Sequence, residues 1–194
     1  TYTRSAFTNN ESTKVNHKTL RGWQTICLPF DVTEITAAKD GFAVPLKPIM
    51  NADFDNGVDD SNDNYNHPFW LYAIGEEGAL APATEIKANV PYLMLVPNDP
   101  DFYAPFYNIP GDITFKGYSI AATDLQVQDG SDYDLRGYFG GTAENLPVQE
   151  GTTYYGLDAK GSAFVQTGFA PIASFQAFAT LPTTPQAAPQ TLSI

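Results

Sequence analysis

The chain has 194 residues, of which 13% are aromatic and 16% charged, with 15 glycines and 15 prolines. The charged fraction is low against the roughly 25% typical of globular proteins, so the composition excludes a disordered chain and favours a β-rich domain with many turns. A formal net charge of −12, from 22 acidic and 10 basic residues, leaves no basic face and excludes nucleic acid as a partner. No apolar run is long enough for a transmembrane segment.

The start of the chain and its single cysteine lead to two further expectations. The chain opens without Met, a basic stretch or an apolar stretch, so we expect any signal peptide to have been removed or left out. Cys27 is the only cysteine, and it lies between Ile26 and Leu28. No intramolecular disulfide can form, and Cys27 is expected to be a buried, small apolar residue.

The stretch from Gly22 to Val32 is predicted to be a central strand with both faces covered. In a strand, Ile26 and Leu28 share one face while Trp23 lies on the other, so each face carries apolar bulk. Pro29 cannot donate to a sheet hydrogen bond, and it should mark the end of the strand or a bulge.

Residues 33–39 are the one predicted helix. Thr33 is a suitable N-cap for this short segment, and Asp40-Gly41 is a suitable stop signal. A first short strand is predicted before it, over Tyr2–Phe7.

Apolar alternation predicts further strands along most of the remaining chain. They are expected at residues 44–50, 69–74, 91–96, 113–120, 133–139, 152–157, 163–167 and 174–181, with a short last segment at 190–194. Asp129-Gly130 and Ala159–Gly161 are hairpin signals. The prediction is an all-β fold, a jelly-roll-like antiparallel β-sandwich forming one domain over residues 1–194. Residues 51–66 form an acidic loop insertion in it, and 182–189 a Pro-rich connector.

Six segments, in this order, carry a resemblance to a known family: residues 23–31, the end of the short helix near 41–42, 86–94, 137–142, 153–157 and 172–178. The set resembles a β-sandwich module of exported surface proteins of gut Bacteroidetes, many described only as adhesion proteins of unknown function. The resemblance implies an extracellular or cell-surface location and transfers no catalytic residue. The chain departs from the family in the 51–66 insertion and at Gln176, where the family more often has Arg.

No set of residues in the sequence predicts an enzyme. His17 and His67 are the only histidines, and both lie in polar sequence. Gly117-Tyr-Ser-Ile-Ala121 imitates a nucleophile elbow, but it lacks the last glycine and falls inside a predicted strand. Cys27 has no basic neighbour in sequence that would lower its pKa.

Loop aromatics are the candidate ligand-binding residues. They lie near prolines and acids, a mixture that sugar-binding surfaces use for stacking and hydrogen bonding: Tyr65, Trp70, Phe102, Tyr103 and Tyr107. The alternative is that most of these rings cap the ends of the sandwich as part of its core, because exposed apolar patches are uncommon unless they serve a partner.

The acidic loop is the candidate metal site, and no other cofactor is expected. Its hard oxygen ligands are Asp53, Asp55, Asp59, Asp60 and Asp63. Calcium takes about 6–8 oxygen ligands, so a weak extracellular calcium site is one interpretation. The spacing fails the EF-hand template, because counting from Asp59 places Trp70 where the closing acid belongs. A solvated insertion is the alternative.

Two classes of function are therefore open. The first is a non-catalytic extracellular or cell-surface interaction module, adhesin-like, whose partner is a glycan or another surface protein. The second is a carbohydrate-binding module or a weak glycan-processing domain. A concave face lined by aromatic rings and paired carboxylates would favour the second class, and a convex, evenly polar surface would favour the first.

Overall fold

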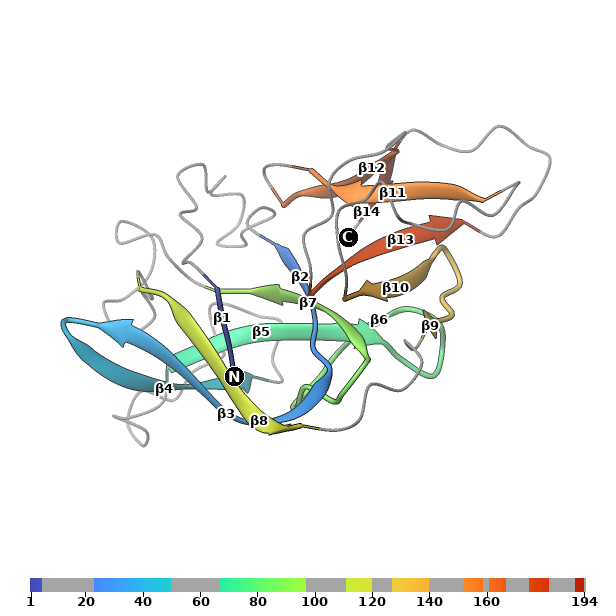
Figure 1. The fold of residues 1–194 in the computed structure, drawn as a ribbon. Helices are drawn as coiled ribbons and strands as arrows, with labels where there is room; N and C mark the ends of the chain where they lie inside the picture. Colours follow the sequence, from blue (N-terminus) through green and yellow to red (C-terminus); the bar gives the residue numbers. More distant parts are fainter. Residues whose placement is uncertain are drawn as a thin grey trace.

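The computed structural model describes residues 1–4, 23–49, 67–96, 111–119, 127–139, 152–158, 161–166, 175–181 and 191–193. Every regular element within these ranges is a β-strand, and the strands form two sheets (Figure 1). The prediction of an all-β fold built as a sandwich is confirmed. No helix long and apolar enough to cross a membrane occurs in the described part of the chain.

The larger sheet takes its strands from the first two thirds of the chain. They are β1 (Tyr2–Arg4), β2 (Gln24–Cys27), β3 (Phe30–Lys39), β4 (Phe42–Ile49), β5 (His67–Ile74), β6 (Leu80–Pro82), β7 (Pro91–Leu95) and β8 (Ile113–Ser119). Their order is β1-β8-β3-β4-β5-β7-β2, with β6 beside β5. The pairing differs from the prediction at one place, since β4 and β5 run parallel. Residues 50–66 supply the long connection that a parallel pair needs.

The smaller sheet is antiparallel throughout. Its strands are β9 (Val127–Gln128), β10 (Asp134–Tyr138), β11 (Thr153–Leu157), β12 (Ala163–Gln166), β13 (Gln176–Leu181) and β14 (Thr191–Ser193), in the order β14-β12-β11-β13-β10-β9. Both predicted hairpins are present, because β9 pairs with β10 and β11 pairs with β12. The short strands β6 and β9 were not predicted.

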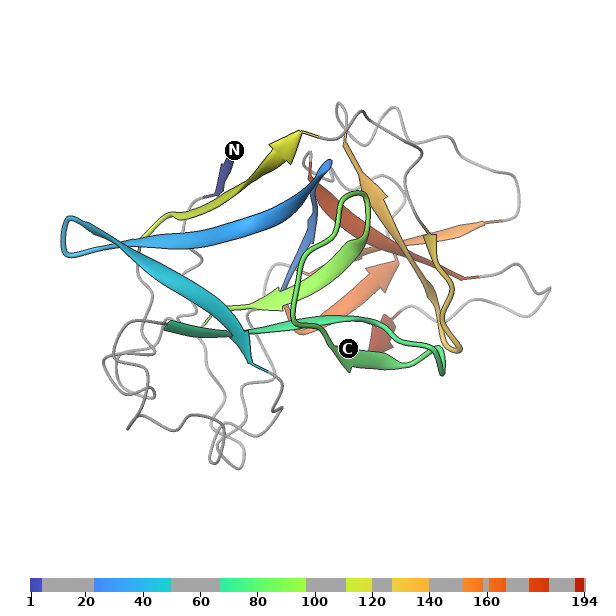
Figure 2. The same ribbon diagram turned by 90° about the horizontal axis from the view of Figure 1, so that it is seen from below.

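The larger sheet curls, as the curved layer in Figure 2 shows. Only Leu28 and Pro29 separate β2 from β3 in sequence, yet β4, β5 and β7 lie between them in the sheet order. The loop after β6 bridges the remaining gap, since Val32 N donates to Ile86 O at 2.9 Å and Asn89 N donates to Leu28 O at 2.7 Å. Pro29 ends the strand, as predicted.

β2 is the last strand in the sheet order rather than a central strand, which corrects the prediction. Its four residues are nevertheless all buried, as expected for a strand with both faces covered. The smaller sheet also covers its free edge: Cys27 N donates to Phe175 O at 2.9 Å, and Ala177 N donates to Thr25 Oγ1 at 3.0 Å. These bonds satisfy edge groups that would otherwise face water or another chain.

The fold has two main apolar cores, one inside the curl of the larger sheet and one between the sheets. The strand β7 contributes to both, because alternate side chains of a strand point to opposite faces. Tyr92 and Met94 lie in the first core, whereas Leu93 packs against the second. Strand β7 is thus part of a wall shared by both cores.

The apolar strands also predict that seven residues belong largely to one buried core: Trp23, Ile26, Leu28, Tyr92, Met94, Phe175 and Phe178. The structure divides them among three clusters. Four of these residues do lie in the first core, and Phe175 packs against it while half-buried. Trp23 instead packs against the core between the sheets, and Phe178 joins Tyr138 in a third cluster. The cause is the curl, which encloses a core that a flat sandwich lacks.

The predicted helix at residues 33–39 is not present, because these residues belong to β3. β3 is hydrogen-bonded to β8 on one edge and to β4 near its end. These tertiary pairings outweigh the local capping signal of Thr33. The stop signal is instead the turn of the β3–β4 hairpin, where Asp40 and Gly41 both have positive φ, 51° and 83°. That is the backbone of a type I′ turn.

Candidate binding site

A seam opens in the larger sheet where β4 changes its partner. Residues 42–45 of β4 pair with β3, whereas residues 46–49 pair with β5. Pro45 and Pro48 lie on either side of the change, and proline provides no N–H to a ladder. Strands β3 and β4 therefore separate at Leu46, and the side chains of the first core come close to the surface there.

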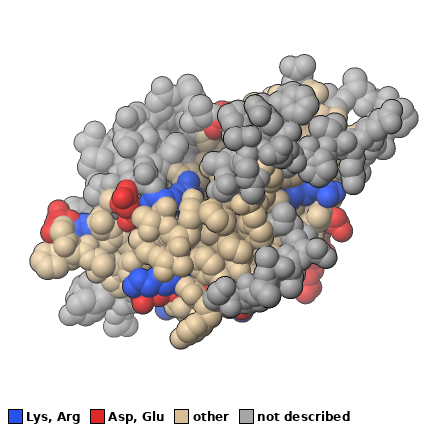
Figure 3. Space-filling model, viewed as in Figure 1, with Lys and Arg blue, Asp and Glu red and all other residues tan. Residues whose placement is uncertain are grey.

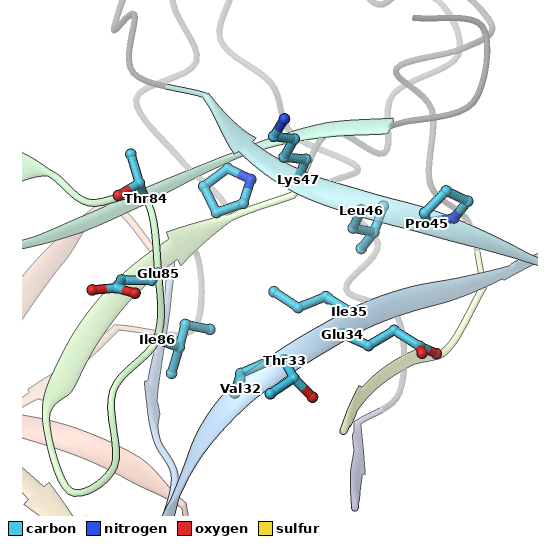
Figure 4. A pocket seen from close by; sticks show the side chains of 11 residues that line it. Val32, Thr33, Glu34, Ile35, Pro45, Leu46, Lys47, Thr84, Glu85 and Ile86 are labelled. Atoms are coloured by element: carbon cyan, nitrogen blue, oxygen red, sulfur yellow. The ribbon is translucent and has the colours of Figure 1, made fainter. Parts of the chain in front are cut away.

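A pocket of about 290 Å³ occupies this seam (Figure 4). Three segments line it: the start of β3, the second half of β4 and the loop at residues 84–86. Its floor is apolar, formed by Val32, Ile35, Leu46, Pro48 and Ile86. Its rim is polar and consists of Thr33, Glu34, Lys47, Thr84 and Glu85.

Lysines already pair with both carboxylates of the rim. Lys116 Nζ lies 2.5 Å from Glu34 Oε1, and Lys87 Nζ lies 2.9 Å from Glu85 Oε2. The hydrogen bond to Glu85 raises the pKa of the Lys87 ammonium. All four side chains are about half exposed, so solvent screens these pairs.

Lys47 is the third charged residue on the rim, beside the two glutamates. It is exposed on β4 and makes no ion pair with any residue that the structure describes. In Figure 4 its side chain points away from Ile35 and Ile86. A ligand that enters the pocket with a negative group beside its apolar part would meet this ammonium.

The β3–β4 hairpin projects from the body of the fold (Figures 1 and 2). An exposed aromatic ring lies at its tip. Phe42, the first residue of β4, is 75% exposed. Lys39 lies opposite it across the hairpin, and the turn residue Asp40 is also exposed. Aromatic residues are enriched in protein interfaces, so this ring is a candidate contact with a partner.

A second exposed ring belongs to Tyr118 of β8, which pairs with the start of β3, at the end opposite the hairpin tip. It is 80% exposed on β8, opposite Asp31. Lys116, which is ion-paired with Glu34, lies two residues before Tyr118 on the same strand. A largely uncharged area with charged groups around its margin occupies this side of the molecule (Figure 3). Strands β1 and β8 also carry hydroxyl groups, since Thr3 Oγ1 and Thr114 Oγ1 are hydrogen-bonded at 3.1 Å.

Of the predicted ligand-binding aromatics, Trp70 is the one that lies among the described residues. Trp70 lies in β5 and is only 1% exposed, so the expectation of a surface ring there is not met. It belongs to the interior because β5 has buried side chains on both faces. The other four, Tyr65, Phe102, Tyr103 and Tyr107, lie outside the described residues.

The candidate calcium ligands Asp53, Asp55, Asp59, Asp60 and Asp63 also lie outside the described residues. Within the ranges that are described, no three His, Cys, Asp or Glu side chains lie together in a way that could hold a metal ion. The calcium interpretation therefore stays a prediction.

The rejected catalytic candidates lie in strands. Gly117 and Ser119 are part of β8, so the elbow-like sequence lacks the strand–turn–helix context of a nucleophile. Cys27 is completely buried, and burial raises the pKa of its thiol from 9.0 to about 12. The thiolate that a nucleophile requires is therefore negligible at neutral pH.

Alkaline pH is expected to destabilise the fold through two buried groups. Burial raises the pKa of Cys27 to about 12, and burial followed by the nearby charge of Asp132 raises the pKa of Tyr133 to about 12. The unfolded chain loses these protons from about pH 9 and 10. Stability contributed by the neutral forms is thus complete below about pH 9 and is lost as pH rises toward 12.

The measurement is the melting temperature of wild type, Cys27→Ala and Tyr133→Phe from pH 7 to 11. Each variant should show a shallower decline than wild type. The Tyr133 hydroxyl is buried without a hydrogen-bond partner in the described structure, so Tyr133→Phe should keep its stability at pH 7. Parallel curves for all three proteins would contradict the assignment.

Sequence reasoning missed both the exposed rings and the pocket. Asp40-Gly41 between apolar alternations is a hairpin signal that would have placed Phe42 beside a turn. The pocket had no such signal, because its lining comes from three separated segments.

The sequence matches no protein-family model, and neither a curated protein nor a solved structure is similar to the chain.

Proposed function

We propose that the chain is a non-catalytic interaction module that acts outside the cell or at its surface. The observation that carries this proposal is the combination of an exposed ring at the tip of a projecting hairpin with an apolar pocket beside the same hairpin. Aromatic anchors and small apolar pockets are the features that give protein interfaces most of their binding energy. The sequence resemblance to exported adhesion proteins supports the location.

The charges at the pocket also support binding rather than chemistry. Glu34 and Glu85 are each matched by a lysine, so the rim holds ion pairs. Paired carboxylates of this kind orient and select a ligand's polar groups, which favours specificity. The adhesin-like role is therefore the first candidate.

A carbohydrate-binding module is the second candidate, and Tyr118 favours it. Its exposed ring lies on the outer face of β8, which also carries the hydroxyl of Thr114 and, between the two, Lys116 in its ion pair with Glu34. Apolar C–H faces of sugars pack on aromatic rings, while their hydroxyls exchange hydrogen bonds with neutral polar groups. This candidate uses a different surface from the hairpin tip.

A glycan-array screen with matched variants tests both candidates. Wild type, Phe42→Ala and Tyr118→Ala are compared on the array and, separately, on immobilised surface proteins of the source cell. Glycan binding lost only in Tyr118→Ala would establish the second candidate. Protein binding weakened about tenfold or more only in Phe42→Ala is the result expected for the first. Product release from esters, peptides or glycans, abolished by one substitution, would contradict the non-catalytic role.

A further inference from the structure

We propose that the partner of the hairpin surface is a second copy of this chain, with Phe42 of each copy in the seam pocket of the other. This inference rests on the proposed function, because it names the partner of that surface. We call the exposed Phe42 side chain the knob. The knob and the pocket lie on the same hairpin, because Phe42 begins β4 and Leu46 of the same strand forms part of the pocket floor.

The size and lining of the pocket suit one aromatic side chain. Small-molecule sites usually measure roughly 300–1,000 Å³, and the seam pocket, at about 290 Å³, falls just below that range. Its floor is apolar, with Ile35, Leu46 and Ile86 almost fully buried. A ring that is 75% exposed in the free chain would gain from entering such a floor.

The charges beside the knob and the pocket are complementary. Asp40 lies in the turn two residues before Phe42 and is exposed. Lys47 lies on the rim of the pocket and makes no ion pair with a residue that the structure describes. When Phe42 enters the pocket of a second copy, the Asp40 carboxylate meets the Lys47 ammonium.

A two-fold axis makes the contact reciprocal. Because each copy presents both the knob and the pocket on one hairpin, the same patch can contact itself, which is the definition of an isologous interface. Two such contacts close the assembly as a dimer and leave no free knob. The hairpin tip is a small surface compared with the roughly 1,200–2,000 Å² of stable interfaces, so the association is weak and transient.

The experiment is sedimentation velocity of the full chain over a wide concentration range. Wild type should show a concentration-dependent monomer–dimer equilibrium, and Phe42→Ala should weaken it about tenfold or more. Val165→Ala is the control, since it shortens an exposed apolar side chain on β12 of the smaller sheet, and it should leave the equilibrium unchanged. Added salt should weaken dimerisation through the Asp40–Lys47 pair.

A double-mutant cycle tests the charge pair. Asp40→Asn keeps a residue that tolerates positive φ, and Lys47→Gln keeps the length of the side chain. Each should weaken the dimer, and the double variant should be no weaker than either one alone. Additive effects would contradict the assigned contact.

Photo-crosslinking locates the knob directly. A benzoyl-phenylalanine in place of Phe42, in a mixture of isotope-labelled and unlabelled copies, should crosslink between copies to the pocket segments 32–35, 45–48 and 84–86. Crosslinks elsewhere, or a wild type that stays monomeric at all concentrations, would overturn the inference. If wild type is monomeric yet Phe42→Ala loses binding to an immobilised surface protein, the second-copy partner is wrong while the interaction role stands.

Discussion

Leu93→Ala and Met94→Ala are each expected to lower the free energy of unfolding by about 2–5 kcal/mol, within one common transition. The two residues are neighbours in β7, are almost fully buried, and point to opposite sides of the strand. Leu93 packs between the two sheets, whereas Met94 packs inside the curl of the larger sheet. Each substitution leaves a cavity in a different core.

The common transition follows from the shared wall. Strands β2, β5 and β7 are hydrogen-bonded side by side, and β7 supplies side chains to both cores. Loss of either core exposes one face of the wall, so neither core is expected to survive alone. Chemical denaturation followed by tryptophan fluorescence and far-ultraviolet circular dichroism measures this.

The control is Val127→Ala, since Val127 is 40% exposed in the short edge strand β9. This variant should change stability by no more than about 0.5 kcal/mol. Two separate transitions in Leu93→Ala, with Met94→Ala affecting only the other one, would show two independent units and would contradict the shared wall.

The sequence predicted most strands because side-chain alternation is a local signal. The strand predicted at residues 91–96 is confirmed as β7, and its residues are buried on both faces. The same reasoning located β2 and its end at Pro29. It could not order the strands, since two runs that look alike in sequence, β2 and β7, have different positions in the sheet.

The failures share one physical cause, which is pairing between distant segments. Residues 33–39 have a helical capping signal, but β3 gains hydrogen bonds to β8, a strand some 80 positions further on. The parallel β4–β5 pair and the curl likewise depend on contacts that no local pattern specifies. Local preference is a weak term, and tertiary context decides.

The candidate site was less predictable than the fold for the same reason. Trp70 looked like a loop aromatic because prolines and acids surround it in sequence. In the structure it is buried in β5, and the residues before and after it in the strand are buried as well. Phe42 looked unremarkable, because its exposure depends on how far the β3–β4 hairpin extends beyond the core. A ring is a binding residue or a core residue according to what the rest of the chain packs against it.

Gly117→Ala is expected to destabilise the fold by about 3 kcal/mol or more, and this effect tests the register of β3 against β8. Gly117 lies opposite Val32, next to the irregularity between Val32 and Glu34. A Cβ at this position would lie 2.0 Å from the carbonyl oxygen of Asp31 and 2.6 Å from the Phe30 ring. The first neighbour is backbone, so the two strands would have to separate to make room.

Gly41→Ala is the matched control for Gly117→Ala, because it adds the same methyl group at a position with free space. Apart from its two neighbours in the chain, no atom of the described residues lies within 4 Å of the added Cβ, and the positive φ of 83° is what opposes it. Its cost should stay near 1–2 kcal/mol, roughly the cost of a left-handed conformation for an L-residue. Thermal and chemical denaturation of the two variants measure the difference. Equal losses for both would mean that β8 does not approach β3 as closely as this pairing requires.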